Sequence, residues 1–429
     1  ERAIPHYHRS ALVAQRVFAY EEAIRLLTHC LTLLAKTPSG SARDKQELGI
    51  QLALAPMYRI TRGWTAPELE RVVDRTLALC DTVGDDEQRA EALYGLQSML
   101  VVQARLERVQ LVGEELHALY QQIEGEAPPL SDMMLAGARF HLGRLDEAND
   151  AFARILTSSH EAQQARHLQE TQGWNVAVHT RAWRAHALWC FGYPERAIRS
   201  ARDAVELAQS LEEPFNQALA ATYLAMLWQM GSDAPAARTH AKEALTLTME
   251  LKAPYYRAWA AILAAYADAS EQTGDKHIAT LRAAIEEFKA TGARLRLTYY
   301  LSLLAGVYGQ AGRPEEGLEA IEEALVHSRD TNERWWDADL HRLRGELMLA
   351  AGRDMQDVDA ALSRAAEIAR GQHAQSLELR VHLTCCHLYT RGRRAEEARR
   401  ALAGVYRRFT EGFDTPDLQA AQALLAGRG

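Results

Sequence analysis

A short sequence motif containing glycine, which we call the mark, recurs along the sequence at a nearly constant spacing. This repetition constrains the fold of the chain. Each copy is a Gly, a few turn residues and then an Ala-rich segment, as at Gly143–Ala148 (GRLDEA). After Gly143 the mark returns in steps of 49, 39, 43, 38, 40 and 40 residues, at Gly192, Gly231, Gly274, Gly312, Gly352 and Gly392. A period of this length is typical of a solenoid of stacked helical units.

The residues of the mark predict a helix–turn–helix. Gly closes one helix because it adopts the left-handed conformation freely, and Pro194 and Pro314 fall at the start of the next helix, where a missing N–H is tolerated. Further breaks, such as Pro214 and Pro254, divide each unit into two helices of roughly 14–18 residues. Neither helix buries its apolar face alone, so neighbouring pairs must stack. We therefore expect an all-α, right-handed α-solenoid of degenerate helix pairs.

This pattern resembles the tetratricopeptide repeat (TPR), in which a small residue lies five positions after the turn Gly. The period differs, since it is nearer 40 residues than 34. By this resemblance, residues 1–125 are expected to form less regular N-terminal helical repeats, and residues 130–429 a TPR-like superhelix that continues the same array. The small residues that match are Ala148, Ala197, Ala236, Ala279 and Gly317.

Composition and charge exclude several classes of protein. Lys and Arg total 49 and Asp and Glu total 57, a net charge of −8, which argues against direct nucleic-acid binding through overall positive charge. Two of the five cysteines are adjacent, which favours reduced, buried thiols over disulfides. No run of about 18 apolar residues and no signal-peptide pattern occurs. We expect a cytoplasmic chain that does not contact a membrane.

Motifs that carry chemistry are absent from the sequence. The phosphate-binding string Gly-x-x-x-x-Gly-Lys-Ser/Thr does not occur, nor do His-Glu-x-x-His, Cys-x-x-Cys or Gly-x-Ser-x-Gly. We expect no enzymatic activity, no cofactor and no metal. The nearest approach to a metal site is a group on one helix, better interpreted as core thiols with histidines nearby: His382, Cys385, Cys386 and His387.

Four phrases resemble the C-terminal TPR region of large bacterial multidomain predicted ATPases. They are Arg62–Glu70, Gly192–Ala197, Glu333–Leu347 and Phe409–Leu418. In that family the region follows an AAA-type or STAND-type nucleotide-binding module, itself preceded by a class III adenylate or guanylate cyclase domain or a winged-helix domain. The resemblance implies a regulatory or sensing region whose catalytic motifs lie upstream. Residue 1 is Glu rather than Met, and we expect the chain to be part of something longer.

The repeat family also implies which residues face the inside of the superhelix. There the first helix of each pair lines the inner wall at 13, 10, 6 and 3 residues before the turn Gly. Applied to this chain, that spacing predicts an Ala-lined middle with room for something apolar or planar, then small residues such as Gly306, then a charged stretch. The predicted ligand- or partner-binding residues are His179, His186, Trp189, Trp228, Tyr299, Asp339, Arg342, Glu346, His382 and Tyr389. The alternative is that these aromatic residues belong to the core.

Three functions remain open from the sequence. The leading hypothesis is a non-catalytic sensor and protein-interaction region of a bacterial signalling ATPase, whose concave face binds a protein partner, the upstream ATPase or cyclase module, or a small effector. The second is a small-molecule receptor domain like that of a transcription activator of the maltose-regulon type, with a closed cavity near His186, Trp189 and Trp228. The third, a helical-repeat enzyme, would need Asp339 and Glu346 as its acids.

Overall fold

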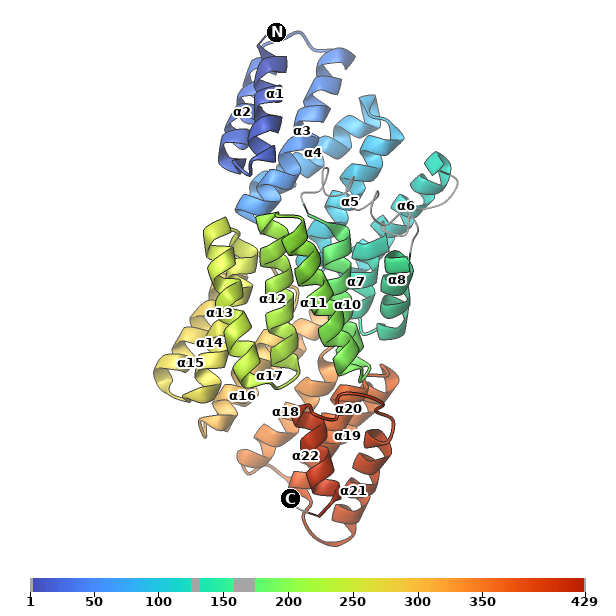
Figure 1. Cartoon of the computed structure of the whole chain (residues 1–429), viewed down its shortest axis with the longest axis vertical. Helices are drawn as coiled ribbons and strands as arrows, with labels where there is room; N and C mark the ends of the chain where they lie inside the picture. The colour runs from blue at the N-terminus through green and yellow to red at the C-terminus, as the bar shows by residue number, and fades with distance from the viewer. Residues whose placement is uncertain (1–2, 125–131, 158–173, 428–429) are drawn as a thin grey trace.

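Figure 1 shows a computed structural model of the chain, which describes residues 3–124, 132–157 and 174–427. These residues form 21 α-helices and no strand, so the expected all-α, right-handed solenoid of helix pairs is confirmed. The boundary predicted near residues 125–130 falls outside the described residues.

The helices pair in chain order, and a single short helix follows the last pair. The pairs are α1 (Ile4–Arg16) with α2 (Tyr20–Leu34), α3 (Ser41–Arg62) with α4 (Pro67–Val83), α5 (Asp86–Val102) with α6 (Leu106–Glu124), α7 (Met133–His141) with α8 (Leu145–Thr157), α10 (Val176–Cys190) with α11 (Pro194–Ser210), α12 (Pro214–Met230) with α13 (Ala234–Leu251), α14 (Pro254–Glu271) with α15 (Asp275–Ala290), α16 (Leu297–Gln310) with α17 (Pro314–Thr331), α18 (Asp337–Ala350) with α19 (Met355–Gly371), and α20 (Gln375–Leu388) with α21 (Gly392–Tyr406). The last helix is α22 (Pro416–Leu425).

Residues in the left-handed conformation separate the two helices of most pairs. Five of the marker glycines lie at the turns between paired helices with φ between 69° and 87°: Gly143, Gly192, Gly312, Gly352 and Gly392. In three other turns a different residue type takes the left-handed conformation, namely Phe18, Ala104 and Ser232, with φ of 60°, 55° and 59°. The helix pairs therefore begin well before the first regular mark of the sequence.

One hydrophobic core runs through most of the array. It extends from Ile60 to Leu377 and includes side chains of both α6 and α7, the helices on either side of residues 125–131. Smaller clusters bury the first helices and the last ones. The boundary predicted near residues 125–130 stays a prediction, and the hydrophobic core is continuous across it.

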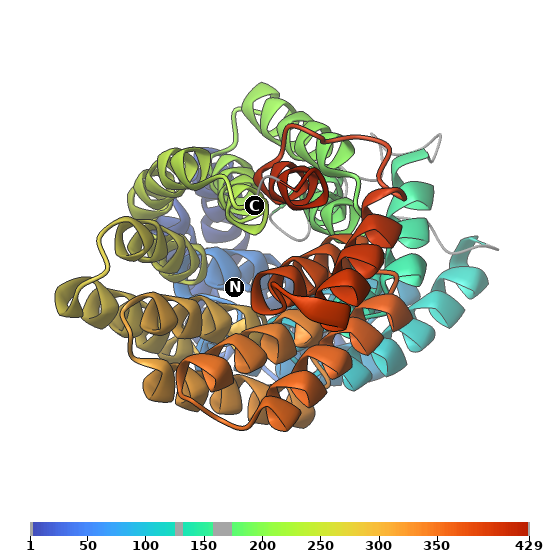
Figure 2. The same ribbon diagram turned by 90° about the horizontal axis from the view of Figure 1, so that it is seen from below.

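The array winds into a superhelix, and its second turn contacts its first. In Figure 2 the helices circle the long axis. The amides of Arg294 and Leu295, before α16, donate to the Val102 carbonyl at the end of α5, with N–O distances of 2.9 and 3.1 Å. The amide of Arg334, before α18, donates to the His141 carbonyl at the end of α7 at 2.7 Å. Pairs that lie five places apart in the array are thus in direct contact.

Candidate functional site

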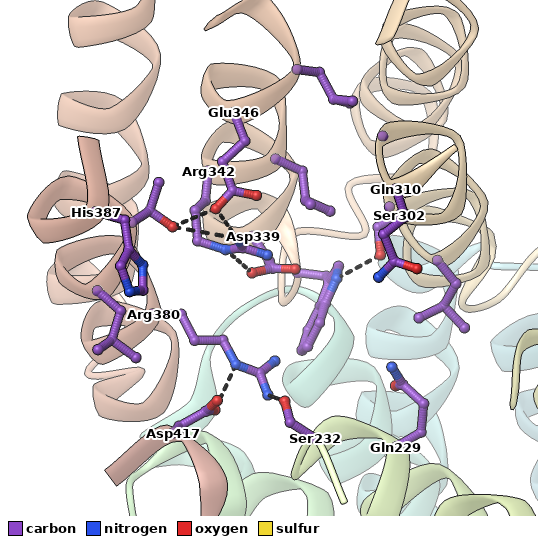
Figure 3. Close-up of a pocket in the computed structure, with 18 of the residues that line it drawn as sticks. Gln229, Ser232, Ser302, Gln310, Asp339, Arg342, Glu346, Arg380, His387 and Asp417 are labelled. Atoms are coloured by element: carbon purple, nitrogen blue, oxygen red, sulfur yellow. Dashed lines mark hydrogen bonds and ion pairs between the residues drawn. The ribbon is translucent and has the colours of Figure 1, made fainter. Parts of the chain in front are cut away.

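A pocket of about 570 Å³ lies on the inner wall of the second half of the array. The first helices of five successive pairs line it, α12, α14, α16, α18 and α20, and α22 contributes at one end (Figure 3). We call it the central pocket. Its polar lining residues are Gln229, Ser232, Ser302, Gln310, Asp339, Arg342, Glu346, Arg380, Thr384, His387 and Asp417, and its other lining residues are Tyr266, Leu303, Gly306, Gly309, Trp336, Leu343, Leu347, Ala350 and Leu383.

Two glycines on α16, which have no side chain, contribute to the volume of the central pocket. A Cβ atom placed on Gly306 would meet no heavy atom within 4 Å, so the helix borders open space at this position. One turn further on, a Cβ atom on Gly309 would lie 3.0 Å from Leu347 of the neighbouring helix α18. Gly309 therefore allows α18 to lie close to α16, and Gly306 leaves the pocket open beside the helix.

A charged cluster on α18 forms one wall of the central pocket. Arg342 donates from Nε to Oδ1 of Asp339 at 2.6 Å and from Nη1 to Oε1 of Glu346 at 2.8 Å. The spacing of three and four residues along one helix face allows both contacts. Thr384 of α20 donates to the same Glu346 oxygen at 2.6 Å. Desolvation by burial would lower the pKa of Arg342, but the two carboxylates outweigh it and raise the pKa above its ordinary value.

A second arginine, Arg380 of α20, joins the two superhelical turns at the pocket (Figure 3). Its guanidinium donates to Oδ2 of Asp417 at 2.8 Å, to Oγ of Ser232 at 2.7 Å and to the carbonyl oxygen of Met230. The same group lies 4.7 Å from the centre of the Trp189 ring, within the range of a cation–π contact. Arg380 thus fastens α20 and α22 to the end of α12.

Aromatic rings form the floor of the central pocket. Trp336 donates from Nε1 to Oγ of Ser302 at 2.9 Å, which fixes the plane of the indole. Behind it lie Tyr299, with ring centres 5.0 Å apart, and Trp189, at 6.1 Å. Burial raises the pKa of Tyr266, so this phenol remains protonated at neutral pH.

The central pocket brings together the charged residues predicted from the sequence. Asp339, Arg342 and Glu346 all line it, as does Gly306. Trp189 and Tyr299 are almost fully buried and support the pocket from behind Trp336. Their role as binding residues stays a prediction, because neither lines the central pocket.

Trp228 lies beside a different and smaller pocket. It stacks on His240 with ring centres 6.1 Å apart and lines a space of about 190 Å³ together with Trp189. His186 does not line this space. In the region of the expected closed cavity, the described residues thus form a small, mainly apolar pocket beside the two tryptophans.

His179 and His186 lie in the interior and not on an accessible wall. His179 Nε2 is 2.9 Å from the hydroxyl oxygen of Tyr223, and His186 Nε2 donates to the Tyr223 carbonyl at 3.0 Å. Burial lowers the pKa of each histidine to about 3. The room expected beside the alanines is filled by the side chains of Tyr223, Trp183, Trp259 and Arg296, so the expectation of an open, Ala-lined middle is wrong.

The residues of α20 predicted to line the inner wall differ from those that line the central pocket. The prediction counts back from Gly392, but α20 already ends at Leu388, so the count starts too late. His382 and Tyr389 consequently line a groove of about 320 Å³ beside α19 and α21, away from the central pocket. The residues of α20 that do line the pocket are Arg380, Leu383, Thr384 and His387.

The arrangement of the central pocket suits binding better than acid–base catalysis. Asp339 and Glu346, the acid pair considered from the sequence, are held by the same arginine. Among the described residues, no group of three or more His, Cys, Asp and Glu side chains is placed to hold a metal ion. Burial raises the pKa of the Cys385 thiol to about 11.

Within residues 3–124, 132–157 and 174–427, no helix has the length and apolarity that crossing a membrane requires.

Comparison of the sequence with known proteins gives one short match. No protein-family model matches the chain. A segment of 89 residues is 38% identical to an uncharacterised protein of Rhizobium meliloti (strain 1021), and the match covers 21% of this chain but only 9% of that protein. The chain therefore spans a small part of the length of the relative that it matches.

Solved structures align with most or all of the chain. A Rap protein complexed with competence and sporulation factor has a TM-score of 0.54 and 15% identity, over 91% of this chain and all of that one. A STAND protein with a tetratricopeptide repeat sensor from Pyrococcus horikoshii has a TM-score of 0.41 and 13% identity, over 85% and 53% of the two chains. Yeast Tom70 has a TM-score of 0.36 and 11% identity, over all of this chain and 96% of that one. The likeness to the Rap protein exceeds a TM-score of 0.5, and at 15% identity it concerns the fold alone. This fold is a TPR-like helical-repeat solenoid.

Proposed function

We propose that this chain is a recognition region that binds a short segment of a protein partner in the central pocket and catalyses no reaction. The observation that carries the proposal is the pocket itself, which the first helices of five successive pairs build on the inner wall of the solenoid. Repeat solenoids recognise partners on such concave surfaces. Its volume of about 570 Å³ falls within the range of sites that hold small ligands or a few residues of a peptide.

The chemistry of the lining favours a polar, extended occupant. An extended peptide presents unpaired backbone N–H and C=O groups, which need partners once they leave water. Gln229, Gln310 and Thr384 offer donors and acceptors at separate points of the central pocket. The Rap protein of similar fold is complexed with competence and sporulation factor, which supports the binding of a factor by this architecture. A small apolar effector, as in the maltose-regulon type of receptor, finds less support.

The recognition region would serve a larger regulatory protein. The four phrases that resemble the C-terminal region of bacterial predicted ATPases support this context, and the Rhizobium meliloti relative is far longer than the segment it shares with this chain. A partner segment that contacts both α12 and α20 would favour one arrangement of the two superhelical turns. An attached ATPase or cyclase module that senses this arrangement would then change its activity.

Blocking the central pocket tests the proposal. We would select peptides that bind the immobilised chain from a random display library, synthesise the enriched sequences and measure their affinity by fluorescence polarisation. Gly306→Trp places an indole in the open space beside α16 and should weaken binding at least tenfold without lowering the melting temperature.

Gly404→Trp is the matched control, because a Cβ atom at Gly404 of α21 also meets nothing within 4 Å and this residue does not line the central pocket. Its affinity for the peptides should equal that of the unchanged chain. Equal binding by the Gly306→Trp variant would place the site elsewhere. ATP turnover by the purified chain would contradict the non-catalytic part of the proposal.

A further inference from the structure

The central pocket holds more carboxylates than guanidinium groups. Asp339, Glu346 and Asp417 line it together with Arg342 and Arg380, so its formal charge is −1 with His387 neutral. Both guanidinium groups already have carboxylate partners inside the pocket. A negatively charged ligand would have to displace one of these carboxylates while facing the others, which is unfavourable at short range.

Several acceptor oxygens of the central pocket are not used by the protein. Among the described residues, hydrogen bonds engage only Oδ1 of Asp339, Oε1 of Glu346 and Oδ2 of Asp417, so each carboxylate keeps its second oxygen. A ligand that supplies N–H donors can engage these second carboxylate oxygens.

We infer that the central pocket binds a positively charged side chain, and that the partner segment presents an arginine to it. This inference rests on the proposed function. A guanidinium has five N–H donors in a planar fork that suits carboxylate oxygens, and its flat face stacks on aromatic rings such as those of Trp336 and Tyr266. Lysine would satisfy the charge but lacks the fork and the flat face. The net charge of −8 of the whole chain favours the approach of a basic segment.

The charge of the ligand is tested on the ligand itself. Peptides selected on the chain should be enriched in arginine. Each enriched peptide is then made again with its arginine replaced by citrulline, which keeps the shape but carries no charge. We expect citrulline to weaken binding about tenfold or more in fluorescence polarisation, and lysine to be intermediate. Raising the salt concentration should weaken the arginine peptide more than the citrulline peptide.

A protein variant then tests whether the charge of the peptide is recognised by Glu346 in the central pocket. Glu346→Gln retains an oxygen that can accept from Arg342 and Thr384, so the wall should keep its geometry. The Glu346→Gln variant should reduce several-fold the ratio of the affinity for the arginine peptide to that for the citrulline peptide, which we call the advantage of arginine. Glu315→Gln is the matched control, because Glu315 pairs with Arg353 at the surface and does not line the central pocket. It removes the same charge from the chain and should leave the advantage unchanged.

The possible outcomes separate this inference from the proposed function. If Gly306→Trp blocks the selected peptides but citrulline binds as well as arginine, or acidic peptides dominate the selection, the inference is overturned and the proposed function stands. If no selected peptide is sensitive to Gly306→Trp, the proposed function fails and the inference fails with it. Because the citrulline comparison needs no protein variant, it remains decisive even if Glu346→Gln perturbs folding.

Discussion

Arg296 organises a network of buried polar groups in the middle of the molecule. It is 1% exposed, and its amide donates to Oε1 of Glu333 at 2.7 Å. Its guanidinium donates to the hydroxyl oxygens of Tyr223 at 2.7 Å and Tyr255 at 3.1 Å. Glu333 also lies 2.9 Å from Nδ1 of His141, on the other superhelical turn. Removing one partner of such a buried network leaves another unsatisfied, which is strongly destabilising.

The buried histidines beside this network predict how stability depends on pH. Burial lowers the pKa of His186 to about 3, whereas in the unfolded chain it is near 6.5. As the pH falls below 6.5, the unfolded state binds a proton that the folded state does not, so stability is lost. Between pH 7.5 and 5.5 this one group should remove about 1.4 kcal/mol from the free energy of unfolding. Urea unfolding of a His186→Gln variant should therefore show a smaller loss over this interval by that amount.

His29→Gln provides the comparison for this prediction. His29 is exposed on α2, so its replacement controls for the loss of a histidine that is not buried in the core. Equal pH dependence in the His186→Gln variant and the unchanged chain would show that His186 is protonated inside the folded molecule.

At the scale of helices, two glycines predict opposite effects of the same substitution. A Cβ atom on Gly137 of α7 would lie 2.2 Å from the Trp183 ring, which is fully buried. Gly137→Ala should therefore lower the free energy of unfolding by about 1–3 kcal/mol through overpacking, although alanine is the better helix former. Gly49→Ala in α3, where a Cβ atom meets nothing within 4 Å, should raise it by up to about 1 kcal/mol. Thermal and urea unfolding of both variants measure the two signs, and stabilisation by Gly137→Ala would contradict the packing of α7 on α10.

The helices themselves were largely predictable, because proline and glycine mark their ends. Pro194, Pro214, Pro254 and Pro314 each occupy the first position of a helix, as the sequence indicates. The early turns were harder to predict, since Ala104 and Phe18 take the left-handed conformation that glycine normally marks.

The position of α20 shows why the candidate site was only partly predictable. A count from the turn glycine reaches Asp339, Arg342 and Glu346, which line the central pocket, because α18 ends two residues before Gly352. Their role in binding stays a prediction. For the last pair the same count fails, because the distance from the helix end to the glycine is longer. A spacing rule holds only while the turn keeps its length, and turn length is set by local packing that the pattern does not record.

At the scale of the whole molecule, contacts between superhelical turns determine what lies inside. Ser376 donates to the carbonyl oxygen of Trp189 at 2.6 Å, and Arg196 pairs with Glu411 at 2.8 Å. Such contacts join residues about two hundred positions apart, and no periodicity within one repeat predicts them. The sequence therefore indicated a solenoid but not that its second turn closes on the first, which is why the inner wall was expected to be open where aromatic side chains fill it.

The contact between the two turns at Arg380 gives a prediction about dynamics. The helix α22 buries Leu418 and Ala421 and packs Leu424 and Leu425 partly against the same cluster, and the ion pair of Asp417 with Arg380 adds a polar contact to α20. Arg380→Gln should speed amide hydrogen exchange in α22 about tenfold or more, and also in the turn at Ser232, while α1 to α4 exchange as before. Arg364→Gln is the control, because Arg364 pairs with Glu367 at the surface of α19. Uniformly faster exchange in all helices would show that Arg380 stabilises the array as a whole, and unchanged exchange in α22 would show that apolar packing alone holds this helix in place.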